Sequence, residues 1–308
     1  MLKHRPIANP NVMIRARTGV DAVEVHLEWA HHLLCEQFPQ EARQPLSTVR
    51  PQGTDHTVYR LGKDKVIRFP RTVQAAQSLE KEIQWLPRIS PKLPLKTPLP
   101  LHIGKPHGDY PFHWMIGAWI AGETLQAASC SLDLLQCAAD LGHFVKALHQ
   151  AKVPDGPSSK RGQALITRHE ATCQAIVQLK DAYDLNQLRG LWETALSTPT
   201  WRGAPLWVHG DLHPGNLLVQ HGRLRAVLDF GLTGVGDPAC DMMPAWTLFT
   251  KETRENFRAV VGADADTWAR GQGWALTFGL VAYPYYRVRN PAFARVAQRT
   301  IEAVLEDA

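Results

Sequence analysis

The chain has 308 residues, of which 44% are hydrophobic and 20% charged, and its 34 Lys and Arg against 29 Asp and Glu give a formal net charge of +5. This composition excludes a disordered or fibrous chain, and the basicity is too mild to indicate a nucleic-acid partner. No apolar run of about eighteen residues occurs and the N-terminus has no signal-peptide core, so we expect no membrane span and a cytoplasmic protein.

The cysteines give no sign of a disulfide framework or a zinc ribbon. They are odd in number, widely spaced and without a CxxC pair, which favours a reducing compartment. The five are Cys35, Cys130, Cys137, Cys173 and Cys240.

The first 120 residues or so predict mixed helices and strands. Near-helical apolar spacing over residues 20–38 predicts that a helix begins the fold. Two runs rich in β-branched and aromatic residues, 57–61 and 65–69, predict a β-hairpin. A helix is expected over 73–89, broken by Pro87 or running just past it, and a proline-rich stretch then leads to a strand near 114–120.

The rest of the chain is expected to be mainly helical. One helix follows Ser131 as its N-cap, and two more are predicted over 166–183 and 184–196. Residues 154–162 predict a loop, in which Ser158 and Ser159 are expected to be solvated because no strand–elbow context surrounds them. Helices are again expected from Met242 onward, so the fold class is α+β.

The most informative segment is HGDLHPGN at 209–216, followed by LDFG at 228–231. Apolar strands bracket this polar loop, so Asp211, Asn216 and Asp229 are expected at strand ends, where loop residues converge on a site. Mg²⁺ in phosphoryl-transfer sites takes carboxylate and amide oxygens together with substrate phosphates, and Asp229 with Asn216 supplies such a set. Asp211 would then be free to position an acceptor hydroxyl and take its proton late in the reaction.

These motifs, together with GDPACD at 236–241, resemble the aminoglycoside phosphotransferase family of small-molecule kinases, over nearly the whole chain. The resemblance implies a protein-kinase-like bilobal fold, with a β-rich nucleotide-binding lobe over residues 1–119 and a mainly helical lobe over 120–308. It implies that Asp211 is catalytic and that Asn216 and Asp229 bind Mg²⁺. Asp241 is expected to brace the catalytic loop, and His209 to be a buried hydrogen-bonding anchor.

The N-terminal half carries a weaker resemblance. Arg68 lies where protein kinases have a phosphate-binding Lys, with Glu82 as its helix partner and Glu80 close enough to compete. Gly53 lies in the turn where the nucleotide loop belongs. Backbone groups near Ala118 and Ile120 are expected to receive the nucleotide base, and ATP and GTP stay equally open as donors.

Single residues of the motif also have ordinary structural explanations. Asp211, Asn216 and Asp229 each suit a turn or a cap, and only their order, spacing and bracketing strands together favour a kinase site. His213 is left unassigned. The 14 histidines, including His31–His32 and the group of His102, His107 and His113, lack a strong metal-ligand spacing.

The acceptor is expected to be a small molecule with a hydroxyl group, with antibiotics as prominent examples. From Ala239 to Ala308 basic and acidic residues balance at eight each, and ten of the 25 aromatic residues lie there. A pocket wall that is aromatic and has no net charge suits a partly apolar acceptor such as a macrolide better than a polycationic aminoglycoside. Core packing of these rings explains them equally well for Trp268, Trp274, Phe278 and Tyr283.

The leading hypothesis is therefore a Mg²⁺-dependent antibiotic kinase that acts as a monomer or a weak homodimer. The alternatives are a kinase of another metabolite and a non-catalytic nucleotide-binding protein on a kinase scaffold. Nucleic-acid binding is motivated only by the pI near 9.0.

Overall fold

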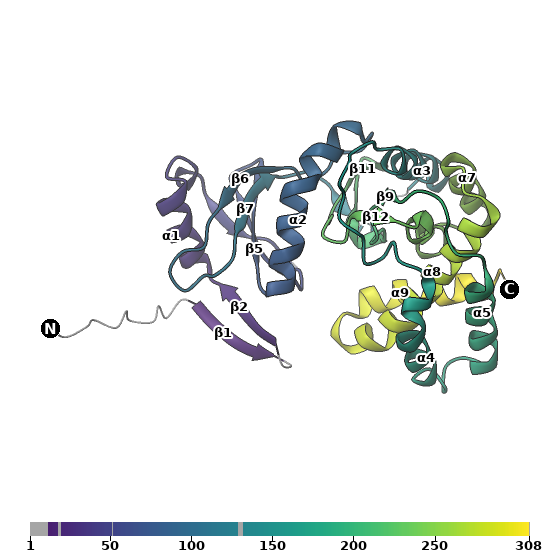
Figure 1. Cartoon of the computed structure of the whole chain (residues 1–308). Coiled ribbons are helices and arrows are strands. Elements are labelled where there is room, and N and C mark those ends of the chain that lie inside the picture. The colour runs from purple at the N-terminus through teal and green to yellow at the C-terminus, as the bar shows by residue number, and fades with distance from the viewer. Residues whose placement is uncertain (1–11, 18–19, 51, 129–131, 308) are drawn as a thin grey trace. The chain divides into compact units, whose positions relative to one another are not determined.

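The computed structural model of the chain describes residues 12–17, 20–50, 52–128 and 132–307 (Figure 1). Two compact units divide the chain. One consists of Met1–Pro87 and Pro98–Ile120, and the other of Arg88–Thr97 and Ala121–Ala308. No helix among the described residues is both long and apolar enough to cross a membrane.

The first unit is built on a five-stranded antiparallel sheet in the order β3-β4-β5-β7-β6, with a separate β1–β2 pair. Its elements are β1 (Val12–Arg17), β2 (Val20–Val25), α1 (Leu27–Gln37), η1 (Glu41–Arg43), β3 (Leu46–Thr48), β4 (His56–Leu61), β5 (Lys65–Pro70), α2 (Val73–Ile89), η2 (Ser90–Lys92), β6 (Pro100–Gly104) and β7 (Trp114–Ala118), of which the end of α2 and η2 belong to the second unit.

The helix expected over residues 20–38 is wrong in its first part. Residues 20–25 form strand β2, antiparallel to β1, and the helix begins only at Leu27. Val23 and Val25 are buried whereas Ala22 and Glu24 are half-buried, which is the alternation of a strand. Because the segment is short, its apolar residues fit both periods, and pairing with β1 decides between them.

The other predictions for this unit agree with the structure. Strands β4 and β5 form the expected hairpin, and α2 has the bounds predicted, running past Pro87. The proline-rich stretch supplies β6 at the edge of the sheet, where a proline in the strand costs no ladder hydrogen bond. Strand β7 ends at Ala118, two residues before the expected end.

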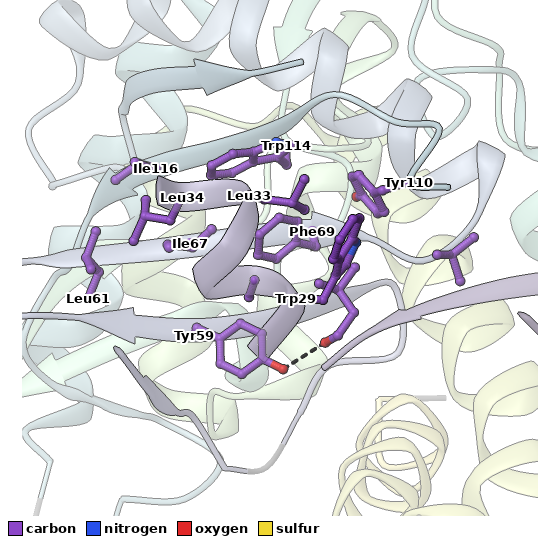
Figure 2. Close-up of a cluster of buried hydrophobic side chains, with 13 residues drawn as sticks. Trp29, Leu33, Leu34, Tyr59, Leu61, Ile67, Phe69, Tyr110, Trp114 and Ile116 are labelled. Atoms are coloured by element: carbon purple, nitrogen blue, oxygen red, sulfur yellow. Dashed lines mark hydrogen bonds between the residues drawn. The ribbon is translucent and has the colours of Figure 1, made fainter. Parts of the chain in front are cut away.

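Side chains from α1 and from alternate strand residues form the core of the first unit (Figure 2). Leu33 and Leu34 of α1 pack with Ile67 and Phe69 of β5, and the Tyr59 hydroxyl donates to the Val25 carbonyl over 2.7 Å. Since side chains alternate along a strand, Arg68 points to the opposite face, toward α2. Figure 1 shows α1 and α2 flanking this sheet.

The second unit is mainly helical and contains two small sheets, β11-β10-β8 and β12-β9. Its elements are β8 (Glu123–Thr124), α3 (Leu134–His149), η3 (Leu165–Arg168), α4 (His169–Val177), α5 (Leu185–Ser197), β9 (Leu206–Val208), η4 (Pro214–Asn216), β10 (Leu217–Gln220), β11 (Arg223–Val227), β12 (Gly234–Gly236), η5 (Pro238–Met242), α6 (Pro244–Thr247), α7 (Lys251–Val261), α8 (Ala265–Arg289) and α9 (Pro291–Leu305).

Helix boundaries in this unit differ from those expected at two places. The N-cap of α3 is Asp133, whose carboxylate accepts the Gln136 N–H over 3.0 Å, whereas the expected cap, Ser131, lies outside the described residues. The helix expected over 166–183 ends at Val177, and Asp184 then caps α5 through the N–H groups of Asn186 and Gln187.

Helix α8 is fastened to the η5 segment through buried polar and steric contacts. Arg270 makes a two-pronged contact with Asp237, at 2.8 and 3.2 Å, and both side chains are nearly inaccessible. Close packing requires Gly271, because a Cβ there would lie 2.4 Å from the Met242 Cβ. The η5 segment is thereby held in place between α8 and β9, the strand that leads into the 209–216 loop and pairs with β12.

Candidate active site

The HGDLHPGN loop connects β9 to β10 and is held by one buried carboxylate. Asp241 of η5 is fully buried, and its two oxygens accept the backbone N–H groups of His209 and Gly210 over 2.9 and 2.8 Å. His149 of α3 approaches the same carboxylate at 3.2 Å. Charge-assisted bonds of this kind are strong, so the start of the loop is firmly fixed.

Gly210 is required by both conformation and space. Its φ of +81° lies in the left-handed region, and a Cβ would lie 3.0 Å from the Cβ of Arg161. This glycine therefore lets the loop turn sharply before Asp211 while another segment packs against it.

His209 links the loop to the segment that carries Asp229. Its ring is fully buried against Phe230, Nδ1 accepts the Asp211 N–H over 3.1 Å, and Nε2 lies 3.0 Å from the Leu228 carbonyl. Because Nδ1 is an acceptor, the ring proton is on Nε2 and donates to that carbonyl. The imidazole therefore acts as a buried spacer between the two segments.

Asp211 and Asn216 contact each other directly. The Asn216 amide Nδ2 donates to the Asp211 carbonyl over 2.9 Å and to its Oδ2 over 3.2 Å. His213 accepts the Gly215 N–H on Nδ1, which leaves Nε2 to face Asp211 Oδ2 at 3.6 Å. The Asp211 side chain is 23% exposed, so it is held on one side and accessible on the other.

The electrostatic environment keeps Asp211 ionised. Burial alone would raise its pKa, but the hydrogen bond with His213 and the positive charge of Arg161 lower the pKa to about 2. The carboxylate is thus an acceptor for a hydroxyl proton over the whole neutral range.

Asp229 sits beside Asn216 in a strained backbone conformation. The Leu228 N–H donates to the Asn216 carbonyl over 2.8 Å, which places the residue just before β10 beside the segment just after β11. Asp229 has φ of +61°, uncommon for a residue with a side chain, and its exposed carboxylate accepts the Gly231 N–H over 3.4 Å.

This donor set fits a hard divalent cation. With Nδ2 of Asn216 donating to Asp211, its Oδ1 is the atom left for a ligand, and the Asp229 carboxylate is exposed. Among the residues that the structure describes, no group of three or more His, Cys, Asp or Glu side chains could hold a metal ion. A cation at Asn216 and Asp229 would therefore depend on phosphate oxygens to complete its shell.

In the first unit, Arg68 pairs with Glu82 and not with Glu80. The Arg68 guanidinium lies 2.6 Å from the Glu82 carboxylate, which is fully buried on α2. Glu80 is 55% exposed and instead contacts His113 at 3.1 Å.

The remaining nucleotide-site predictions have looser surroundings. Gly53 is exposed in the loop before β4, where the nearest atom to an added Cβ would be the His56 carbonyl at 3.9 Å. The Ala118 N–H donates to the Leu99 carbonyl over 3.2 Å and is thus already used within the sheet, while Ile120 is half-buried just beyond the strand.

Two residues of the 154–162 loop matter in ways that sequence reasoning missed. The expectation that Ser159 is solvated is wrong: the residue is fully buried, and its hydroxyl donates to the Leu232 carbonyl over 2.9 Å, whereas Ser158 is exposed. Arg161 lies against Gly210. Neither contact has a local sequence signal, because both join segments more than 45 residues apart.

The aromatic residues of the C-terminal helices divide into two groups. Trp274 and Phe278 of α8 are buried, which supports core packing for them, whereas Tyr285 is 54% exposed. The ring of His213 stacks on Phe278 and meets Phe293 of α9 edge-on, at 6.1 and 5.0 Å between centroids. A partly exposed aromatic cluster of Tyr285, Tyr286 and Phe293 thus adjoins the loop that carries Asp211.

Comparisons with known proteins give one family match and one curated relative. Residues 48–274 match the sequence model of a family described as the phosphotransferase enzyme family. The uncharacterized protein YcbJ of Bacillus subtilis (strain 168) is 38% identical over 74 residues, so the match spans 23% of this chain and only 24% of that protein.

Solved structures resemble the whole fold. The GDP complex of aminoglycoside 2'-phosphotransferase-IIIa superposes with a TM-score of 0.69 and 22% identity, over 90% of this chain and 98% of that one. Macrolide 2'-phosphotransferase MphH from Brachybacterium faecium gives a TM-score of 0.60 and 22% identity, over 87% and 98% of the two chains. The expected α+β fold, with an N-terminal antiparallel sheet and a helical C-terminal part, is confirmed.

Proposed function

This chain belongs to the phosphotransferase enzyme family, and we propose that it transfers the γ-phosphoryl group of ATP or GTP to a hydroxyl group of a small molecule. The observation that carries the proposal is the assembly of Asp211, Asn216 and Asp229 on two adjoining segments, with Asp241 and His209 holding the backbone between them. These residues form the catalytic and metal-binding part of the proposed site.

In this proposal Asp211 orients the acceptor hydroxyl and takes its proton late in the reaction. Its low pKa keeps the carboxylate ready to accept, and its bond from Asn216 fixes which oxygen faces the acceptor. Asn216 and Asp229 would hold Mg²⁺, which neutralises charge on the phosphates when bound. Asp241 and His209 touch neither substrate and serve to position the loop.

In the first unit, Arg68 is proposed to bind donor phosphates. Glu82 restricts the guanidinium to one orientation, and a planar fork of donors suits phosphate oxygens. Gly53 and the backbone near Ala118 and Ile120 complete the proposed nucleotide contacts, of which the Ala118 carbonyl is a better candidate than its N–H, since the N–H is bonded to Leu99.

The acceptor is proposed to be an antibiotic of the macrolide or aminoglycoside type. Both kinds of phosphotransferase are among the structural relatives, and the aromatic cluster beside His213 favours a partly apolar molecule. Because ATP and GTP are cytoplasmic metabolites, the proposed compartment is the cytoplasm, and we propose a monomer or a weak homodimer.

A panel of acceptors tests this function. The purified protein is incubated with Mg·ATP or Mg·GTP and single macrolides, aminoglycosides and unrelated hydroxylated metabolites, and the products are weighed by mass spectrometry. A mass gain of one phosphate on an antibiotic supports the proposal, whereas a gain only on a metabolite would show that the acceptor is not an antibiotic. Tight Mg-nucleotide binding without transfer or hydrolysis across the panel would instead indicate a non-catalytic binding protein.

A further inference from the structure

The loop of residues 156–162 is fixed by hydrogen bonds to β12 and within itself, and it lies beside the proposed active site. It runs alongside β12, with the Ser159 N–H bonded to the Val235 carbonyl over 3.0 Å and the Val235 N–H to the Pro157 carbonyl over 2.7 Å. The buried Ser159 hydroxyl also accepts the N–H groups of Arg161 and Gly162, each over 3.2 Å. These bonds fix the backbone from which Arg161 projects.

Arg161 lies directly beside the catalytic loop. Its Cβ and Cγ would be 3.0 and 3.3 Å from a Cβ at Gly210, the residue before Asp211. Its guanidinium lies over the Trp274 ring of α8, 5.8 Å from the centroid. The charge acts on Asp211, whose pKa it helps to lower.

The N–H groups of the Arg161 guanidinium are available for a ligand. Among the described residues, Arg161 makes no side-chain hydrogen bond and no salt bridge, and it is only half-buried. Structural arginines in such fixed positions normally pair with a carboxylate, as Arg270 does with Asp237. An arginine that is held by its backbone and an aromatic ring, yet keeps its fork of N–H groups open, is suited to an anionic ligand.

One face of α8 supports this arrangement. Trp274 and Phe278 are four residues apart on the helix and so lie on the same side. The first ring lies under Arg161 and the second is stacked with His213. The two cationic or hydrogen-donating groups that act on Asp211 are thus both positioned by α8.

We propose that Arg161 is a further catalytic residue, which binds the γ-phosphoryl group during its transfer. The inference rests on the proposed function and extends it. In the step, the acceptor oxygen forms a bond to the γ-phosphorus while the bond from that phosphorus to the bridging oxygen breaks. The electron pair stays on the nucleoside diphosphate, and the acceptor proton passes to Asp211. An Arg in cis stabilises the negative charge on the transferred group.

A transition-state mimic provides a test that does not need the acceptor. Binding of Mg·ADP is titrated with and without aluminium fluoride, which occupies the place of the transferred phosphoryl group, in the wild type, Arg161→Gln and Arg161→Lys. Lys160→Gln is the matched control, because it removes a positive charge from the exposed neighbouring position. Hydrolysis of Mg·ATP, where water is the acceptor, is measured in the same set.

We expect aluminium fluoride to tighten Mg·ADP binding in the wild type and in Lys160→Gln. In Arg161→Gln the gain in Mg·ADP affinity from aluminium fluoride should be at least about tenfold smaller, and the rate of Mg·ATP hydrolysis about 10²-fold lower. The affinity for Mg·ADP without aluminium fluoride should stay within about twofold of the wild type. Arg161→Lys should recover part of both, because it retains the charge without the planar fork.

Two outcomes separate failure of this inference from failure of the proposed function. If aluminium fluoride tightens Mg·ADP binding equally in the wild type and Arg161→Gln, and both hydrolyse Mg·ATP at the same rate, the phosphoryl role is refuted. If, in that case, Arg161→Gln loses only acceptor phosphorylation, Arg161 would instead bind an acidic group of the acceptor. If the wild type binds Mg·ADP but neither tightens with aluminium fluoride nor hydrolyses Mg·ATP, the proposed phosphotransferase function itself fails.

Discussion

The two regions that are proposed to handle the reaction are built very differently. Around Asp211 the backbone is held by buried groups: Asp241 binds two N–H groups, and His209 bridges two segments. In the first unit, Gly53 lies in an exposed loop where the nearest described atom to an added Cβ would be 3.9 Å away, whereas the Arg68–Glu82 pair is firmly held. Chemistry that depends on distances of tenths of an ångström needs the first kind of support, whereas a nucleotide loop has to admit and release its ligand.

Of these changes, replacing Asp241, which holds the 209–216 loop, should have the largest effect on stability. Asp241→Asn replaces one acceptor oxygen by an NH₂ group that faces a backbone N–H, in a fully buried place. We expect the free energy of unfolding to fall by about 3 kcal/mol and turnover to fall about 10²-fold, because the loop moves. Urea unfolding and steady-state rates check this.

The control for that variant is Asp140→Asn, which breaks a surface contact to Arg223. It should change the free energy of unfolding by less than about 1 kcal/mol and leave turnover unchanged. Equal effects of the two variants would mean that the loop does not depend on the brace.

In the first unit, Arg68→Lys should alter nucleotide binding more than stability. Lysine keeps a positive charge opposite the buried Glu82 but loses the planar fork. We expect the KM for ATP or GTP to rise about tenfold, with the free energy of unfolding changed by about 1 kcal/mol at most. An unchanged nucleotide KM would contradict the assignment of Arg68 to the phosphates.

The two regions should also respond differently to acid. Burial, with the charge of Arg68, lowers the pKa of His56 to about 2, against 6.5 in the unfolded chain. The unfolded state therefore takes up this proton first, and stability that is complete above pH 6.5 is lost as the pH falls toward 2, by at most about 1.4 kcal/mol per unit. Asp211, with its pKa also near 2, loses its contribution only below its unfolded value of 3.8.

Unfolding at pH 7 and pH 5 measures this difference. His56→Gln should flatten the loss of stability over that interval, whereas substitution of the exposed His143 by Gln should not. A wild-type curve that is unaffected by His56→Gln would show that this histidine is not kept neutral by the fold.

Gly53→Ala should have the smallest effect. The glycine has no positive φ, and the nearest described atom would be 3.9 Å from the new Cβ, so the free energy of unfolding should stay level or rise by up to about 1 kcal/mol. The nucleotide KM should rise by less than about tenfold. A large loss of stability would show that this loop is not as open as its surroundings indicate.

Sequence reasoning was most successful where one segment determines its own structure. The hairpin of β4 and β5 and the helix α2 follow from periodicity within a few residues, and the HGDLHPGN and LDFG segments indicate the family. The segment at 20–25 was misassigned because its apolar residues fit both a helix and a strand until β1 is known to pair with it.

Contacts between distant segments could not be predicted. Ser159 looks like an ordinary loop serine, and only its burial against Leu232 reveals a structural role. Arg161 and Gly210 come together because the 156–162 loop follows β12, a path that no local pattern encodes. The choice between Glu82 and Glu80 likewise needed the rotation of α2 relative to β5.

The most direct test of the whole account is Asp211→Asn, compared with Asp181→Asn, which changes an exposed carboxylate. Transfer of the γ-phosphoryl group from Mg·ATP or Mg·GTP, to water or to an acceptor found in the panel, is followed together with nucleotide binding. We predict that Asp211→Asn lowers transfer by about 10² to 10⁴ while nucleotide binding stays within a few-fold, and that Asp181→Asn behaves as the wild type. Unchanged transfer by Asp211→Asn would contradict the account.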